Sequence, residues 1–186
     1  MVLLHTPPGE IGASAADFSL PGIDGRTHTL ADYQDARVLV IMFICNHCPY
    51  VQAIEKRLIA LAGEMASKGV RFVGINSNDP INYPADSFEN MKKRAAEKGY
   101  PFDYLMDESQ EIARTYGAIC TPDFFIFDSE RKLRYRGRLD DSPRNPAAVK
   151  KEEMREALLA LLAGKEIPEP QHSAMGCSIK WKDEEL

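Results

Sequence analysis

Two cysteines, Cys45 and Cys48, lie two residues apart in the stretch FICNHCPYV, with His47 between them and Pro49 directly after the second. Thiols at this spacing suit a redox centre, half of a metal site, or two small hydrophobic side chains at a tight corner. A purely structural disulfide is the weakest interpretation, because a bridge that closes so short a loop adds little stability. The choice depends on the elements that position this pair.

The size and charge of the chain exclude several classes of protein. Its 186 residues are enough for one domain with a proper core, and 44% hydrophobic with 27% charged residues is an ordinary globular composition. The net charge of −5 argues against nucleic-acid binding, which needs a positive surface. The start, MVLLHTPPGEIG, lacks a basic region and a long apolar run, and no segment approaches the ~20 apolar residues of a membrane span. We therefore expect a soluble cytoplasmic protein, unless the sequence is the mature part of a longer precursor.

The order of the expected elements indicates an α/β fold. The stretch VLVIMFI is typical of a strand buried on both faces, and the helix after it carries Cys48 and Pro49 in its first turn. Alternating strands and helices predict a mixed sheet covered on both sides, forming one domain over residues 1–164 with a tail at 165–186 that packs on it. The expected strands are 38–44, 70–76, 102–106, 122–128 and 132–140, and the later helices are 86–98, one within 107–117, and 148–163.

With that order, the residues resemble the thioredoxin-like superfamily, and within it the peroxiredoxin and TlpA-like (AhpC/TSA-type) branch. The resemblance covers about 17–162 and rests on Cys-x-x-Cys at a strand-to-helix corner together with Thr121-Pro122 at the start of a later strand. It implies a thioredoxin-like fold with an N-terminal β extension, and a thiol–disulfide oxidoreductase that needs no cofactor. The implied partners are a protein or small-molecule disulfide and a reductant such as thioredoxin or glutathione, with neither nucleic acid nor membrane.

The resemblance also implies a role for each residue of the site. Cys45 is expected to be the exposed attacking thiol and Cys48, one turn further in, the resolving thiol. A helix N-terminus favours a thiolate, and His47 would add to that effect if protonated or donating a hydrogen bond. A histidine before the second cysteine, as in protein disulfide isomerase, predicts a couple less reducing than thioredoxin. Thr121 and Pro122 are expected to bind the substrate chain, with a cis peptide bond between them.

The mechanism also depends on what two further cysteines do and on which group accepts the proton of Cys48. Cys120 lies two positions before the proline, and Cys177 lies in the tail motif MGCSIKW. Either is a candidate relay that exchanges with the central pair, and for Cys120 a buried structural thiol is the alternative. Thioredoxin buries an aspartate beneath its cysteines, but VLVIMFI contains no acid. The proton acceptor for Cys48 is therefore not identified from the sequence.

Two other functions remain open. A peroxiredoxin-like peroxidase would use Cys48 followed by Pro49 as its reactive site and Cys45 as its resolving thiol, although Ile41 and Cys45 replace the proline and threonine of that family. A metal-binding thioredoxin-fold chaperone would use both thiols and His47 as soft ligands. The adjacent position of His47 makes it difficult for the ring to turn inward with both thiols, so we predict no metal site.

Overall fold

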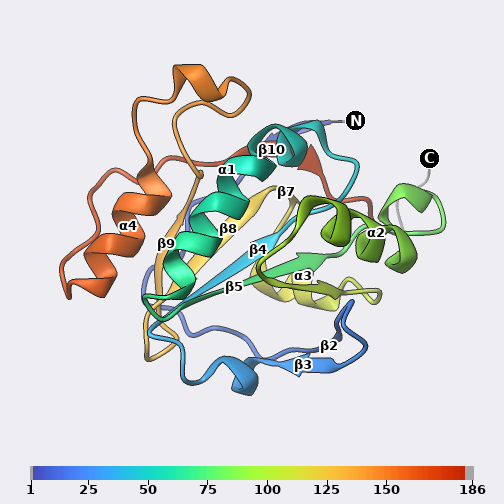
Figure 1. Ribbon diagram of the computed structural model, residues 1–186, viewed down its shortest axis with the longest axis horizontal. Helices are drawn as coiled ribbons and strands as arrows, with labels where there is room; N and C mark the ends of the chain where they lie inside the picture. The colour runs from blue at the N-terminus through green and yellow to red at the C-terminus, as the bar shows by residue number, and fades with distance from the viewer. Residues whose placement is uncertain (1, 183–186) are drawn as a thin grey trace.

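Residues 2–182 are described by a computed structural model in which strands and helices alternate along the chain (Figure 1). The elements, with η marking a 3-10 turn, are β1 (Leu3–His5), β2 (Ser19–Pro21), β3 (Thr27–Thr29), η1 (Leu30–Tyr33), β4 (Val38–Phe43), α1 (Pro49–Ala66), β5 (Val70–Asn76), η2 (Pro84–Asp86), α2 (Phe88–Lys98), β6 (Asp103–Met106), α3 (Glu111–Tyr116), β7 (Cys120–Thr121), β8 (Asp123–Phe127), β9 (Leu133–Gly137), η3 (Pro146–Ala148), α4 (Glu153–Leu162) and β10 (Met175–Ser178). Among the described residues no helix is both long and apolar enough to cross a bilayer.

A five-stranded sheet forms the centre of the molecule, in the order β6-β5-β4-β8-β9. The strands β4, β5 and β6 run parallel, and β8 and β9 are added antiparallel. Every residue of β4 is buried, as its continuous apolar run predicts for a central strand. The predicted mixed α/β sheet and thioredoxin-like fold are therefore confirmed.

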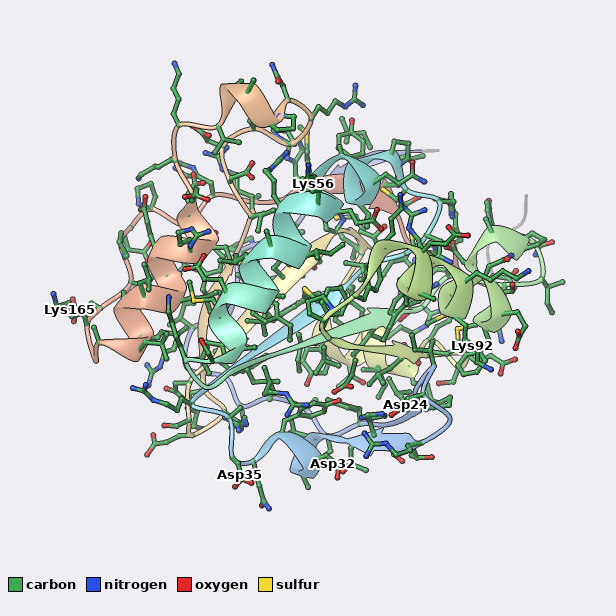
Figure 2. All side chains as sticks on the ribbon, in the orientation of Figure 1. Asp24, Asp32, Asp35, Lys56, Lys92 and Lys165 are labelled. Carbon is green, nitrogen blue, oxygen red and sulfur yellow. The ribbon has the colours of Figure 1, made fainter. Side chains whose placement is uncertain are left out.

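Successive side chains of β4 point to opposite faces of the sheet and enter two separate cores. Val40 and Met42 pack with residues of α1, α2 and α4, whereas Leu39 and Ile41 pack with residues of α3 and of the hairpin β2–β3. Figure 1 shows these layers, with α1 lying across the sheet and the hairpin along its other side. The acidic residues Asp24, Asp32 and Asp35 follow the outer rim of that hairpin layer (Figure 2).

Two helices begin later than the sequence predicts, and for the same reason. The chain before α2 forms the separate turn η2, after which Ser87 accepts a hydrogen bond from the amide of Asn90 and starts the helix. The chain before α4 forms η3 and then becomes extended at Val149. In both places a proline opens a short turn of its own instead of the first turn of the long helix.

The tail after α4 returns to the domain and forms a strand that the sequence analysis did not predict. This strand, β10, pairs antiparallel with β1 on one side and β7 on the other. Its residue Cys177 lies opposite Leu3 and Thr121, and Ile179 just beyond it is completely buried. The boundary at residue 164 between domain and tail stays a prediction, and residues 183–186 of the tail lie outside the described part.

Candidate redox site

The cysteine pair lies at the corner between β4 and α1. The apolar run ends at Phe43, and Pro49 opens the helix at a position where no intrahelical amide hydrogen bond is lost. Cys48 is therefore the N-cap residue of α1, in extended conformation. The backbone amide of Val51, in the first turn of the helix, contributes to lowering the pKa of its thiol.

The surroundings of Cys48 favour its thiolate form. Hydrogen bonding from the thiol of Cys45 lowers the pKa of Cys48 to about 5, against the opposing effect of burial, with further contributions from the thiol and amide of Cys177. The same sulfur lies 3.2 Å from the carbonyl oxygen of Thr121, which accepts a hydrogen bond only from the protonated thiol. The donors together outweigh burial and leave the pKa of Cys48 lowered.

Cys45 differs from its expected role. Its side chain is 1% exposed, and burial raises its pKa well above the usual value, as do its hydrogen bond to Cys48 and the charge of Asp86. The hydroxyl of Thr121, 3.2 Å from its sulfur, acts in the opposite direction. The expectation of an exposed Cys45 with a lowered pKa is therefore wrong, because segments from β7 and η2 enclose it and the lowered pKa belongs to Cys48.

His47 binds a buried carboxylate. Its Nδ1 lies 2.5 Å from Oδ2 of Asp86, which is completely buried, and the ring stacks on Tyr83 with 5.4 Å between centroids. Burial raises the pKa of Asp86, but hydrogen bonds from His47 and Asn78 outweigh it and leave the pKa lowered. The ring of His47 is thus paired with Asp86, and this carboxylate opposes the effect on the thiols that was expected of the ring by raising the pKa of Cys45.

Asp86 is the functional residue that sequence reasoning missed. It supplies from η2 the buried acid that β4 lacks, and its carboxylate accepts hydrogen bonds from the amide of Asn46 at 2.6 Å and the side chain of Asn78 at 2.7 Å. The polar loop SNDPINYP after a buried strand was the available signal. Asn76 at the end of β5 and Asn78 in that loop hold Asp86 and the tail rather than a ligand.

Three groups in the site offer atoms that metals bind. Ligand atoms of Cys45, His47 and Asp86 lie within 4.8 Å of one another, so the ring comes near one thiol, and Cys48 is not part of this group. However, both oxygens of Asp86 already accept hydrogen bonds, Oδ1 from two backbone amides and Oδ2 from His47 and Asn78. A metal ion would have to displace these donors, so hydrogen bonding accounts for the cluster.

The peptide bond between Thr121 and Pro122 is cis, which confirms the prediction. Thr121 contacts both sulfurs of the pair, Cys45 through its hydroxyl and Cys48 through its carbonyl. Its backbone edge, which was expected to bind the substrate chain, pairs with Cys177 of β10. The chain's own tail therefore occupies this edge.

The two candidate relay cysteines differ in position. Cys177 is 4% exposed and its thiol hydrogen-bonds to the sulfur of Cys48. Cys120 is completely buried in β7, and burial, followed by the charge of Asp123, raises its pKa to about 12. All four cysteines are in the reduced state. The structure thus brings together Cys45, Cys48 and Cys177.

Comparison with known proteins agrees with the fold and with a redox family. Residues 11–136 match the AhpC/TSA family. The chain is 25% identical over 126 residues to the thiol-disulfide oxidoreductase ResA of Geobacillus thermodenitrificans, with 67% of each chain covered. It is 29% identical over 109 residues to a putative peroxiredoxin of Mycobacterium tuberculosis, covering 58% of this chain and 63% of that protein.

Solved structures extend the similarity to the whole length. An uncharacterized conserved protein from Geobacillus kaustophilus superposes with a TM-score of 0.95 at 50% identity, covering 100% of this chain and 99% of that chain. Thioredoxin-fold structures at 16–23% identity superpose with TM-scores of 0.58–0.63, which supports the fold alone. The match to the Geobacillus kaustophilus structure covers the whole of this chain, so it includes the tail that lies over the cysteine pair.

Proposed function

The chain belongs to the AhpC/TSA family of thioredoxin-fold proteins, and from this premise we propose that it is a thiol–disulfide oxidoreductase whose couple is Cys45 and Cys48. The observation that carries the proposal is that both sulfurs lie against one residue, Thr121: Cys45 is 3.2 Å from its hydroxyl and Cys48 is 3.2 Å from its carbonyl oxygen. Two thiols held at one corner in this way can form a disulfide, whose bond length is about 2.05 Å. The lowered pKa of Cys48 favours the thiolate that exchange requires.

In the proposed reaction the thiolate of Cys48 attacks the substrate disulfide, and one half of the substrate leaves as a thiolate. Cys48 then holds a mixed disulfide and no longer accepts the proton of Cys45. The substrate thiolate released in the first step is the group we propose to take that proton. The Cys45 thiolate attacks the Cys48 sulfur, and the second half of the substrate leaves with the electron pair of the broken bond.

The occupied edge of Thr121 favours a small-molecule disulfide over a protein. An extended peptide binds a sheet edge through main-chain hydrogen bonds, and here β10 makes those bonds instead. Cys45 and Cys48 are also almost completely buried, which limits the size of what reaches them. We therefore propose a low-molecular-weight disulfide as substrate, with glutathione or thioredoxin as the reductant that recycles the couple.

Peroxide reduction is the second candidate. It is favoured by the lowered pKa of Cys48, since the thiolate is the form that attacks the O–O bond. Cys48 would become a sulfenic acid, and attack by Cys45 would give the disulfide and water. The similarity to a putative peroxiredoxin points the same way.

Turnover assays with glutathione disulfide and with hydrogen peroxide, using cysteine variants, separate these functions. An oxidoreductase is expected to consume glutathione disulfide faster than peroxide, and Cys48→Ser is expected to abolish that activity. Cys120→Ser is the matched control, because this thiol lies outside the hydrogen-bonded group. Faster turnover of peroxide would favour the second candidate, and full activity of Cys48→Ser would exclude both.

A further inference from the structure

The strand β10 carries a third thiol into the site. In Figure 1 it passes beside β7 near the start of α1. Cys177 lies opposite Thr121 in the antiparallel register, where the backbone approaches so closely that a Cβ on Gly176 would lie 1.9 Å from the carbonyl oxygen of Thr121. Only glycine fits this position without displacing the strand. Cys177 is thereby held against Cys48, to which both its thiol and its amide donate.

The strand is fixed on both sides of Cys177. Before it, the amide of Thr6 donates to the carbonyl of Ala174 at 2.9 Å. After it, the amide of Ile179 donates to the carbonyl of Ile119, and the amide of Lys180 donates to the side chain of Asn78, each at 2.9 Å. The contact between Cys177 and Cys48 therefore belongs to the folded core of the molecule.

From this arrangement we propose that Cys177 is a redox-active residue that forms a disulfide with Cys48, so that the disulfide passes between Cys45–Cys48 and Cys48–Cys177. The proposal rests on the proposed function, since it requires Cys48 to become oxidised. In this proposal β10 takes the place of a substrate. An external chain was expected to bind the strand edge beside the cis-proline, and β10 lies at that edge and presents the sulfur of Cys177 to Cys48.

The transfer balances without an external oxidant. The Cys177 thiolate attacks the Cys48 sulfur of the Cys45–Cys48 disulfide, and a new Cys48–Cys177 bond forms. The Cys45–Cys48 bond breaks, its electron pair leaves on Cys45, and Cys45 takes up the proton that Cys177 released. When Cys48 holds a mixed disulfide with glutathione, the same attack expels glutathione as its thiolate.

Oxidation of Cys48 itself prepares Cys177 for this attack. In the reduced protein, burial first, then the hydrogen bond to Cys48 and the charge on Cys48 raise the pKa of Cys177 to about 12. Once Cys48 forms a disulfide, its negative charge disappears and the last two causes are removed. Lys180, which lowers the pKa, remains. The thiol of Cys177 thus becomes more acidic when a disulfide is present to be attacked.

The decisive experiment uses the full-length Cys45→Ser variant, which keeps three thiols of the original four. The reduced variant is treated with glutathione disulfide, quenched in acid, and analysed by thiol counting and peptide mass spectrometry. We expect the thiol count to fall from three to one and a Cys48–Cys177 disulfide to be found without bound glutathione. A persistent glutathione adduct on Cys48 with Cys177 still reduced would overturn the proposal.

Two further variants keep this result interpretable. Cys45→Ser combined with Cys177→Ser is expected to retain glutathione on Cys48, which shows that the adduct is the intermediate. Cys45→Ala replaces Cys45→Ser if the serine variant does not fold. An adduct on Cys48 that persists in all these variants would remove the role of Cys177 and leave the proposed function intact. A Cys48 that never reacts would remove both.

Discussion

At the scale of single residues, the charge on Cys48 is the property on which the chemistry depends. Its pKa of about 5 lies far below the value of about 8.5 for a free thiol. We expect a single thiolate absorbance at 240 nm to appear in the reduced protein with a midpoint near pH 5. Cys177→Ala removes one donor and is expected to raise the midpoint, whereas a midpoint above pH 8 in the unaltered protein would contradict this assignment.

The same pKa predicts how the stability of the reduced protein depends on pH. The pKa of Cys48 is lower in the folded than in the unfolded chain, so its contribution to stability is present at alkaline pH. It is lost as the pH falls from about 8.5 toward about 5. Cys48→Ala is expected to be less sensitive to pH over that range in urea denaturation, and an unchanged slope would count against a buried thiolate.

The carboxylate of Asp86 joins η2 to the cysteine corner and to the loop after β5. In Asp86→Asn one oxygen becomes an amide group, which cannot accept from His47 and Asn78. We expect a loss of about 1–3 kcal/mol in the free energy of unfolding, the usual cost of leaving buried donors unsatisfied. Removal of its charge is also expected to lower the pKa of Cys45.

Glu89→Gln, on the exposed side of α2, is the matched control for this charge removal. It is expected to change the free energy of unfolding by less than about 0.5 kcal/mol, as surface substitutions usually do. Equal losses in the two variants, measured by urea denaturation, would show that Asp86 does not hold the site together.

At the scale of elements, β10 decides which groups surround the sulfurs. Gly176→Ala places a methyl group against the backbone of Thr121, so we expect it to displace β10, lower the melting temperature and raise the pKa of Cys48. Gly63→Ala is the matched control, because nothing lies within 4 Å of its added carbon and alanine favours a helix. Two variants of equal melting temperature would mean that β10 does not pack as described.

The elements that could be predicted from the sequence are those with a local pattern. The buried strand β5 has the predicted bounds, and α2 ends at Gly99 in the left-handed conformation, as a glycine after a helix indicates. The strand β10 has no such pattern, because its place depends on Leu3 and Thr121, which lie far away in the chain. For the same reason the burial of Cys45 and the position of Asp86 were not predicted, since both depend on segments that meet only in the folded molecule.

At the scale of the whole molecule, the two thiols behave as one couple with one shared proton. The lowered pKa of Cys48 and the raised pKa of Cys45 predict that reduction of the disulfide adds two electrons but only one proton between about pH 6 and 8. The potential is then expected to fall by about 30 mV per pH unit. A slope near 59 mV per unit, measured over the same range, would mean that both thiols are protonated in the reduced protein.

The reduction potential tests most directly the claim that Cys45 and Cys48 form a redox couple whose reduced state is stabilised by the Cys48 thiolate. The protein is equilibrated with glutathione buffers at pH 7, quenched in acid, and the Cys45–Cys48 disulfide is quantified by mass spectrometry. Stabilisation of the reduced state by the Cys48 thiolate predicts a reversible two-electron couple less reducing than thioredoxin, with a potential above about −270 mV. A potential at or below that value, or the absence of a Cys45–Cys48 disulfide in the Cys177→Ser variant under oxidising buffers, would contradict it.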